Sequence, residues 1–122
     1  MTMATVDGYE KQAQLFQALS HPVRLRILDI LAQQEACVCH LTAILDQRQP
    51  YVSQQLATLR DAGLVADRRE GTLIYYRLAD EHLVKLLSEG RAVVEDLEEE
   101  SLDFTAVPEG ALDNCPCPRC QG

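Results

Sequence analysis

Sulfur offers the clearest chemistry in this sequence. Five cysteines occur in 122 residues, two of them in a Cys-Val-Cys pair and three close to the C-terminus. The pair is Cys37 and Cys39, and the C-terminal group is Cys115, Cys117 and Cys120. Deprotonated thiols are soft ligands for thiophilic ions, and a helix N-terminus lowers the pKa of a thiol. The five cysteines are therefore candidate metal ligands or redox groups.

The expected compartment supports this chemistry. The N-terminal stretch MTMATVDGYEKQ lacks the basic and apolar regions of a secretory signal, and no apolar run approaches the ~18 residues of a membrane span. We therefore expect a cytoplasmic protein without membrane contact. In a reducing compartment, cysteines serve metal binding or redox chemistry rather than a framework of structural disulfides.

Hydrophobic periodicity indicates the elements that must position the thiols. Apolar residues recur at helical spacing over residues 9–19, 23–34 and 40–46, and in a further helix that Pro50 opens and Gly63 ends. Ser20 and Pro22 supply a cap and a helix-start proline for the second helix. Two strands joined by a turn at residues 69–71 follow within residues 64–78, and a last helix runs from about residue 80 to about residue 99.

These elements predict a mainly α fold with a small β-hairpin. We expect one folded domain over residues 1–100 and an acidic, aperiodic, cysteine-containing tail over residues 101–122. In the hairpin, Ile74, Tyr76 and Leu78 alternate with Leu73, Tyr75 and Arg77, so the two sets face opposite sides. The last helix carries an apolar stripe long enough to need a partner, either its own core or a second chain.

Helical geometry sets a condition on the Cys37 and Cys39 pair, which precedes the short third helix. Positions two apart on an ideal helix point about 160° apart, so both sulfurs reach one ion only if that turn is frayed or unwound. An ion bound there would distort the helix that supports the next one. The alternative is that both cysteines are small buried side chains. The neighbouring His40 is expected to be exposed or to contact DNA rather than to bind metal.

The C-terminal sequence CPCPRC places three thiols within six residues, where prolines restrict the loop. Cys115, Cys117 and Cys120 can complete the site of the Cys-Val-Cys pair, within a subunit or across a dimer, or bind an ion alone as a three-sulfur site. A four-sulfur site would suit zinc, cadmium or lead. The alternative is a terminal segment whose thiols have no function.

Two short helices joined by a polar turn, followed by a hairpin with arginines near its tip, are typical of a winged helix-turn-helix. Its second helix enters the major groove of double-stranded DNA. If Val52, Leu56 and Leu59 are buried, polar side chains that can bond base edges and phosphates remain on the outer face, although they also fit an ordinary solvated surface. The candidate DNA-binding residues are Gln49, Tyr51, Ser53, Gln54, Gln55, Thr58, Arg60, Arg68 and Arg69.

The net charge of −8 first argues against nucleic acid, but its distribution does not. Residues 92–122 hold eight acidic residues and one basic residue, so residues 1–91 sum to only −1. Residues 48–77 contain five arginines and three acidic residues, a local excess of +2. The basic segment coincides with the predicted DNA-reading elements.

The stretches ALSHPVRLRILDIL, CVCHL, QPYVSQQLATLRDAGLV and REGTLIYYRL, in this order, resemble the bacterial ArsR/SmtB family of metal-sensing repressors. The resemblance covers residues 13–98. It implies a homodimer through the first and last helices that binds operator DNA when free of inducer and releases it on metal binding. Two positions depart from the family: Arg48 stands where Ser or Thr is usual, and Gln55 where His is frequent.

The resemblance also bears on the inducer. The Cys37 and Cys39 pair resembles arsenic-responsive sites, whose third cysteine falls at the position of Thr42, so a three-sulfur site must be completed elsewhere. A second, zinc-type family site lies on the last helix. Asp80 and His82 match its first half, but residues 93 and 96 are Val and Asp where the family has His and Glu, so we expect this site to be absent.

Three functions compete. The first is a repressor induced by As(III) or Sb(III), with Cd(II), Pb(II) or Zn(II) next, through cysteine thiolates. The second is a repressor with a redox or reactive-sulfur switch built on a cysteine pair. The third is a small thiol enzyme or metal carrier, prompted by CPCPRC. A redox Cys-x-x-Cys motif belongs at a helix start beside a βαβ unit, and Cys117 and Cys120 lie in an acidic terminal segment instead. We therefore expect no enzyme.

Overall fold

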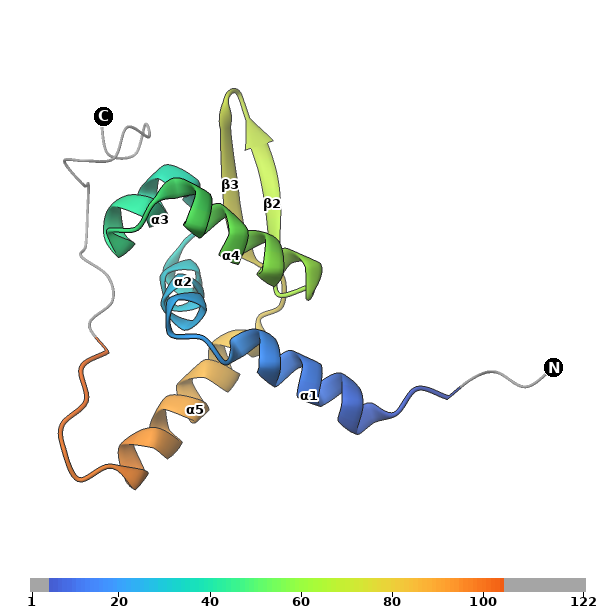
Figure 1. Ribbon diagram of the computed structural model, residues 1–122, viewed down its shortest axis with the longest axis vertical. Helices are drawn as coiled ribbons and strands as arrows, with labels where there is room; N and C mark the ends of the chain where they lie inside the picture. Colours follow the sequence, from blue (N-terminus) through green and yellow to red (C-terminus); the bar gives the residue numbers. More distant parts are fainter. Residues whose placement is uncertain (1–4, 105–122) are drawn as a thin grey trace.

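The computed structural model describes residues 5–104, as five helices and a three-stranded antiparallel sheet (Figure 1). The helices are α1 (Gly8–Leu19), α2 (Pro22–Gln33), α3 (Val38–Leu45), α4 (Gln49–Asp61) and α5 (His82–Leu97). The strands β1 (Ala36–Cys37), β2 (Val65–Glu70) and β3 (Leu73–Leu78) pair in the order β1-β3-β2. The predicted mainly α fold with a hairpin is confirmed, and β1 is an addition to the predicted elements.

The helices α3 and α4 lie beside the hairpin at one end of the molecule, and α1 and α5 lie at the other (Figure 1). Between them, the side chains of α2 and the inner faces of α3 and α4 form the core. The largest fully buried apolar side chains are Ile27, Leu28, Ile30, Leu41, Val52, Leu56 and Leu59. This packing holds the second helix of the helix-turn-helix against a rigid support.

The start of α2 differs from the expectation in one detail. His21, not Ser20, is the N-cap residue, and its Nδ1 accepts a hydrogen bond from the Val23 N–H at 3.2 Å. Ser20 instead closes α1, where its hydroxyl donates to the Gln17 carbonyl at 2.8 Å. Pro22 occupies the first turn of α2 as predicted, because a helix start needs no N–H there.

The end of α4 is fixed by glycine, as the sequence predicts. Gly63 has φ 79°, its N–H donates to the Arg60 carbonyl at 2.9 Å, and the Leu64 N–H donates to the Leu59 carbonyl at 2.9 Å. This pair of bonds is the Schellman motif, in which a left-handed residue satisfies the last helix carbonyls. The motif turns the chain from α4 directly into β2.

The two faces of the hairpin separate as expected. Tyr76, with Ile74 and Leu78, packs on the main core, whereas Tyr75, with Leu73, packs on Cys37 in a second, smaller cluster. Alternation along β3 therefore creates a distinct surface that joins the hairpin to the cysteine-bearing strand. Within residues 5–104, no helix is long and apolar enough to cross a membrane.

Gly63→Ala is expected to lower the free energy of unfolding by about 1 kcal/mol, because a left-handed backbone carries a steric cost for every residue with a Cβ. Gly8→Ala is the matched control, since an added Cβ meets no atom within 4 Å at either position and only Gly63 has positive φ. The control should change stability by less than about 0.5 kcal/mol. Urea denaturation followed by circular dichroism measures both, and equal losses would contradict this role of Gly63.

Candidate nucleic-acid interface and cysteine site

The helix-turn-helix is formed by α3, a short turn and α4. Asp46 ends α3 in the left-handed conformation, with φ 52°, and its N–H donates to the Thr42 carbonyl. Pro50 lies in the first turn of α4, and the N-cap residue Arg48 makes no side-chain capping bond. The departure at Arg48 therefore leaves the helix without the cap that Ser or Thr would supply.

The outer face of α4 is largely as predicted. Gln49, Gln54, Thr58 and Arg60 are exposed, and Tyr51 and Ser53 are half-buried. The Thr58 hydroxyl donates to the Gln54 carbonyl at 3.1 Å, so it is held along the helix. Because His21 Nδ1 accepts from the backbone, the neutral ring carries its proton on Nε2, which donates to the Tyr51 hydroxyl at 3.4 Å.

Gln55 does not point outward, and this expectation was wrong. It is only 8% exposed, and its Oε1 accepts a hydrogen bond from Arg24 Nη1 at 3.0 Å. The Arg24 Nε donates in turn to the Ala18 carbonyl at the end of α1, at 2.6 Å. Gln55 lies three residues after Val52 and four before Leu59, so helical spacing alone places it at the buried face. Arg24 is a structural residue that the sequence analysis missed.

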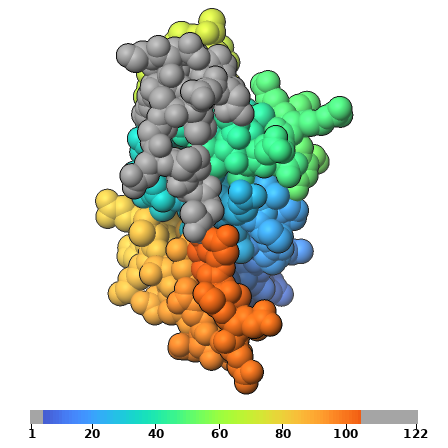
Figure 2. Space-filling model, turned by 90° about the vertical axis from the view of Figure 1, so that its left-hand side faces the viewer, coloured from blue at the N-terminus to red at the C-terminus, as the bar shows by residue number. Residues whose placement is uncertain are grey.

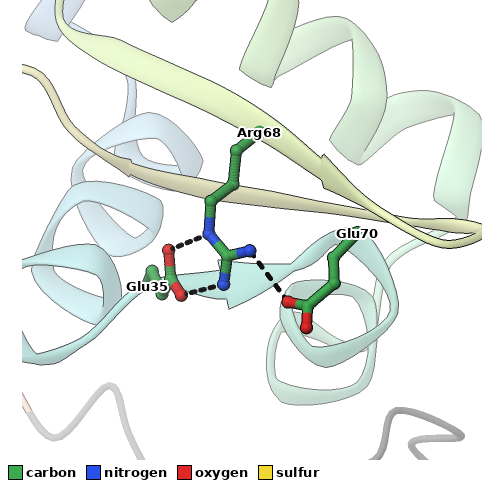
Figure 3. A network of polar contacts seen from close by, with 3 residues as sticks. All are labelled: Glu35, Arg68 and Glu70. Atoms are coloured by element: carbon green, nitrogen blue, oxygen red, sulfur yellow. Dashed lines mark hydrogen bonds and ion pairs between the residues drawn. The ribbon is translucent and has the colours of Figure 1, made fainter.

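The β2–β3 hairpin is the wing of the winged helix-turn-helix, and the arginines on it and beside it differ in their surroundings. Arg69 is exposed on β2, and Arg60 at the end of α4 forms a 3.7 Å ion pair with Asp67. Arg68, by contrast, is held by two carboxylates (Figure 3): Nε and Nη2 donate to Glu35 at 3.0 and 2.5 Å, and Nη1 donates to Glu70 at 2.8 Å. Hydrogen bonding to Glu35, then to Glu70, raises the pKa of Arg68. Arg68 is thus not a free cation at the wing.

Cys37 is the last residue of β1 and the N-cap of α3, with φ −80° and ψ 162°, and Cys39 lies in the first helical turn. The opposed directions expected of two helical positions do not apply, because Cys37 is outside the helix. The two Cα atoms are 5.4 Å apart and the sulfurs are joined in a disulfide. The leading hypothesis of a thiolate metal site predicts free thiols, and the redox hypothesis predicts a cysteine pair. The structure brings the two sulfurs together without unwinding α3.

The environment of the pair is buried. Cys37 is 1% exposed and its Sγ accepts a hydrogen bond from the His40 N–H at 3.3 Å. His40, expected at the surface, is itself buried at 6% exposure. A sulfur that caps a helix N-terminus lies at the positive end of the helix dipole.

Metal-ligand sets are incomplete within the described part of the chain. Residues 5–104 contain no group of three His, Cys, Asp or Glu side chains placed to hold an ion. Cys115, Cys117 and Cys120 lie outside the described residues. Just before α5, Asp80 accepts hydrogen bonds from the backbone N–H and the Nδ1 of His82, which lower the pKa of the Asp80 carboxyl. Asp80 and His82 form the first half of the zinc-type site, and the described residues do not contain its second half.

Comparison with known proteins identifies the family. The sequence profile of the bacterial regulatory proteins of the arsR family matches residues 21–67. A solved structure from Mycobacterium bovis is titled as the homodimeric winged helix-turn-helix DNA-binding domain of a possible ArsR-family transcriptional regulator. It is 32% identical, with TM-score 0.69, covering 84% of this chain and 100% of that one. The chain belongs to the ArsR family. Since this is a family of transcriptional regulators, the expectation that the protein is not an enzyme is confirmed.

Two curated relatives carry functional names. The chain is 44% identical over 85 residues to the transcriptional repressor SmtB homolog of Synechocystis, covering 70% of this chain and 64% of that protein. It is 46% identical over 67 residues to the arsenical resistance operon repressor of Escherichia coli, covering 54% of this chain and 57% of that protein. The chain thus spans less than two thirds of the length of each of these two curated relatives.

The buried position of Gln55 predicts unequal effects of two adjacent substitutions. Gln55→Ala should lower the free energy of unfolding by about 1.5–3 kcal/mol, because it removes the acceptor of a charged donor. Gln54→Ala, one residue away on the exposed face, should change stability by less than about 0.5 kcal/mol. Urea denaturation compares the two variants, and a stable Gln55→Ala protein would show that the link to Arg24 contributes nothing.

Proposed function

We propose that this ArsR-family protein is a transcriptional repressor that binds operator DNA as a homodimer and releases it when an inducer reacts with its cysteines. The observation that carries the proposal is the exposed polar face of α4 beside the wing, on a helix held rigidly by a buried inner face. In this arrangement α4 reads the major groove, and Arg69 and Arg60 contact backbone phosphates. The names of the two curated repressors support the same function.

Self-association is assigned to α1 and α5. Leu83 is the one buried residue of α5, which leaves Val84, Val93, Val94 and Leu97 exposed. A groove of about 680 Å³ lies between the end of α1, the start of α2 and α5. The segment after α5, deep orange in Figure 2, borders this groove, because Asp103 and Phe104 line it. The centre of the Phe104 ring lies 4.4 Å from the Arg91 guanidinium carbon. A second copy would cover this apolar surface, as the homodimeric M. bovis relative supports.

Inducer binding is assigned to the Cys37 and Cys39 thiolates of the reduced protein. Two soft sulfurs held together at a helix N-terminus suit As(III) or Sb(III) first and Cd(II), Pb(II) or Zn(II) next. Because residues 5–104 offer no third ligand, the tail thiols Cys115, Cys117 and Cys120 complete the site, from the same chain or its partner. In this division, residues 1–100 bind DNA and dimerise, and residues 101–122 supply ligands.

A redox switch is the second candidate, and the disulfide between Cys37 and Cys39 favours it. A two-electron oxidant, such as a disulfide or peroxide, removes two electrons and two protons from the thiols as the S–S bond forms. Both candidates act at the N-terminus of α3, which packs directly on α4. In the first candidate both sulfurs bind one ion together with tail thiols, whereas in the second an oxidant removes electrons and the two sulfurs bond to each other.

The DNA-reading assignment predicts two classes of variant. Gln54→Ala should weaken binding to a duplex selected from a random library more than binding to a non-specific duplex, because an amide at this position reads base edges. Arg69→Ala should weaken both alike and reduce the salt slope by about 1, since it contacts phosphate. Fluorescence anisotropy across a salt series measures both. If both variants change specific and non-specific binding in the same proportion, the recognition face has been assigned to the wrong residues.

The sensing assignment is tested on reduced protein bound to the selected duplex under anaerobic conditions. Arsenite or Cd²⁺ should release the DNA from the wild type and not from Cys37→Ser/Cys39→Ser, which should bind DNA normally. Release by diamide alone would favour the redox candidate. A chain ending at Leu112 tests the tail, and unchanged metal affinity, followed by thiolate absorption, would remove its cysteines from the site.

A further inference from the structure

The cysteine pair and the wing share one row of residues across the small sheet. In the register of the strands, Cys37 on β1 faces Tyr75 on β3, and Tyr75 faces Arg68 on β2. Residues paired in register project from the same face of a sheet. Tyr75 packs on Cys37, and the Arg68 guanidinium lies 4.7 Å from the centre of the Tyr75 ring. Contact therefore runs without interruption from the sensor to the wing.

Two carboxylates join this row through strand alternation. Glu35 precedes Cys37 by two residues and Glu70 follows Arg68 by two, so both fall on the side of the sheet that carries the row. Glu35 binds Arg68 with both oxygens, a bidentate geometry that is stronger and more directional than a single ion pair. The Glu35 side chain is only 24% exposed, which shields this contact more than an ordinary surface pair (Figure 3).

This arrangement occupies three of the five N–H donors of Arg68. Nε and Nη2 bind Glu35, Nη1 binds Glu70, and one face of the guanidinium lies on Tyr75. A phosphate can reach these donors only after the carboxylates release them. Because Glu35 directly precedes β1, its position follows that of the strand that Cys37 ends.

We propose that Glu35 is a positioning residue that withholds Arg68 from DNA phosphates and couples the wing to the cysteine pair. This inference rests on the proposed function. When Cys37 and Cys39 form the disulfide, the carboxylates of Glu35 and Glu70 hold Arg68. In the form of the protein that binds DNA more tightly, these carboxylates release Arg68. A change at Cys37 moves Glu35 through β1 and thereby changes the number of phosphates that the wing can neutralise.

The test compares Glu35→Gln with Glu89→Gln, which makes the same charge change at an exposed position on α5. Glu89 does not line the groove, and α5 lies at the other end of the molecule from the hairpin. Both proteins and the wild type, each in the disulfide form, are titrated with a labelled non-specific 30-base-pair duplex (about three helical turns) between 50 and 200 mM salt. Glu35→Gln should bind more tightly, with a salt slope steeper by about 0.9, because one more phosphate is contacted. The ratio of its DNA affinity to that of the wild type should therefore fall about threefold between 50 and 200 mM salt.

A double variant shows whether Arg68 carries the effect. Glu35→Gln/Arg68→Ala should lose the steeper slope, whereas Glu89→Gln should keep the wild-type slope. The ratio of DNA affinities before and after diamide treatment should be smaller in Glu35→Gln than in Glu89→Gln. Circular dichroism confirms that each variant is folded.

Two outcomes would overturn the inference: equal slopes for Glu35→Gln and Glu89→Gln, or a steeper slope that persists without Arg68. A wild-type protein that binds no duplex would instead overturn the proposed function. The two failures are therefore distinguishable in a single series of titrations.

Discussion

The pairing of the two-residue strand β1 with β3 is the constraint on which the functional geometry depends. It fixes Ala36 opposite Tyr76 and Cys37 opposite Tyr75, which places one residue over the main core and the other over the second cluster. It also ends in an extended residue, so that Cys37 caps α3 instead of joining it. The sulfurs meet because one belongs to a strand and the other to a helix. The same pairing brings Glu35 beside the wing.

A second constraint links α1, at the end of the molecule proposed for self-association, to α4. Arg24 binds the last carbonyls of α1 and the buried side chain of Gln55 on α4. A cation suits the C-terminal end of α1, where the helix dipole is negative. In a dimer formed through α1 and α5, this connection sets how each α4 stands relative to the interface. The spacing of the two half-sites on DNA would depend on that angle.

The uneven charge of the chain agrees with this division of the molecule. Most of the net charge of −8 belongs to residues 92–122, beyond the elements that carry the candidate DNA contacts. Within the basic segment, however, the arginines are not equivalent. Arg60 and Arg68 are paired with carboxylates, whereas Arg69 is exposed on β2. Counting charges therefore overstates the cations that the wing offers to phosphate.

The sequence by itself determined what local physics controls. Periodicity placed the helices and the alternating faces of the hairpin, and a glycine with positive φ ended α4 where its position predicted. The tertiary structure alone decided the partners of Gln55 and Arg68, because these hydrogen bonds join residues 31 and 33 positions apart. It also decided the short strand β1, because two residues have no periodicity to detect and become a strand only when β3 lies beside them. Local sequence patterns leave several hydrogen-bond and strand partners possible for each of these residues. The packing of the core determines which distant segments come into contact, and therefore which partners form.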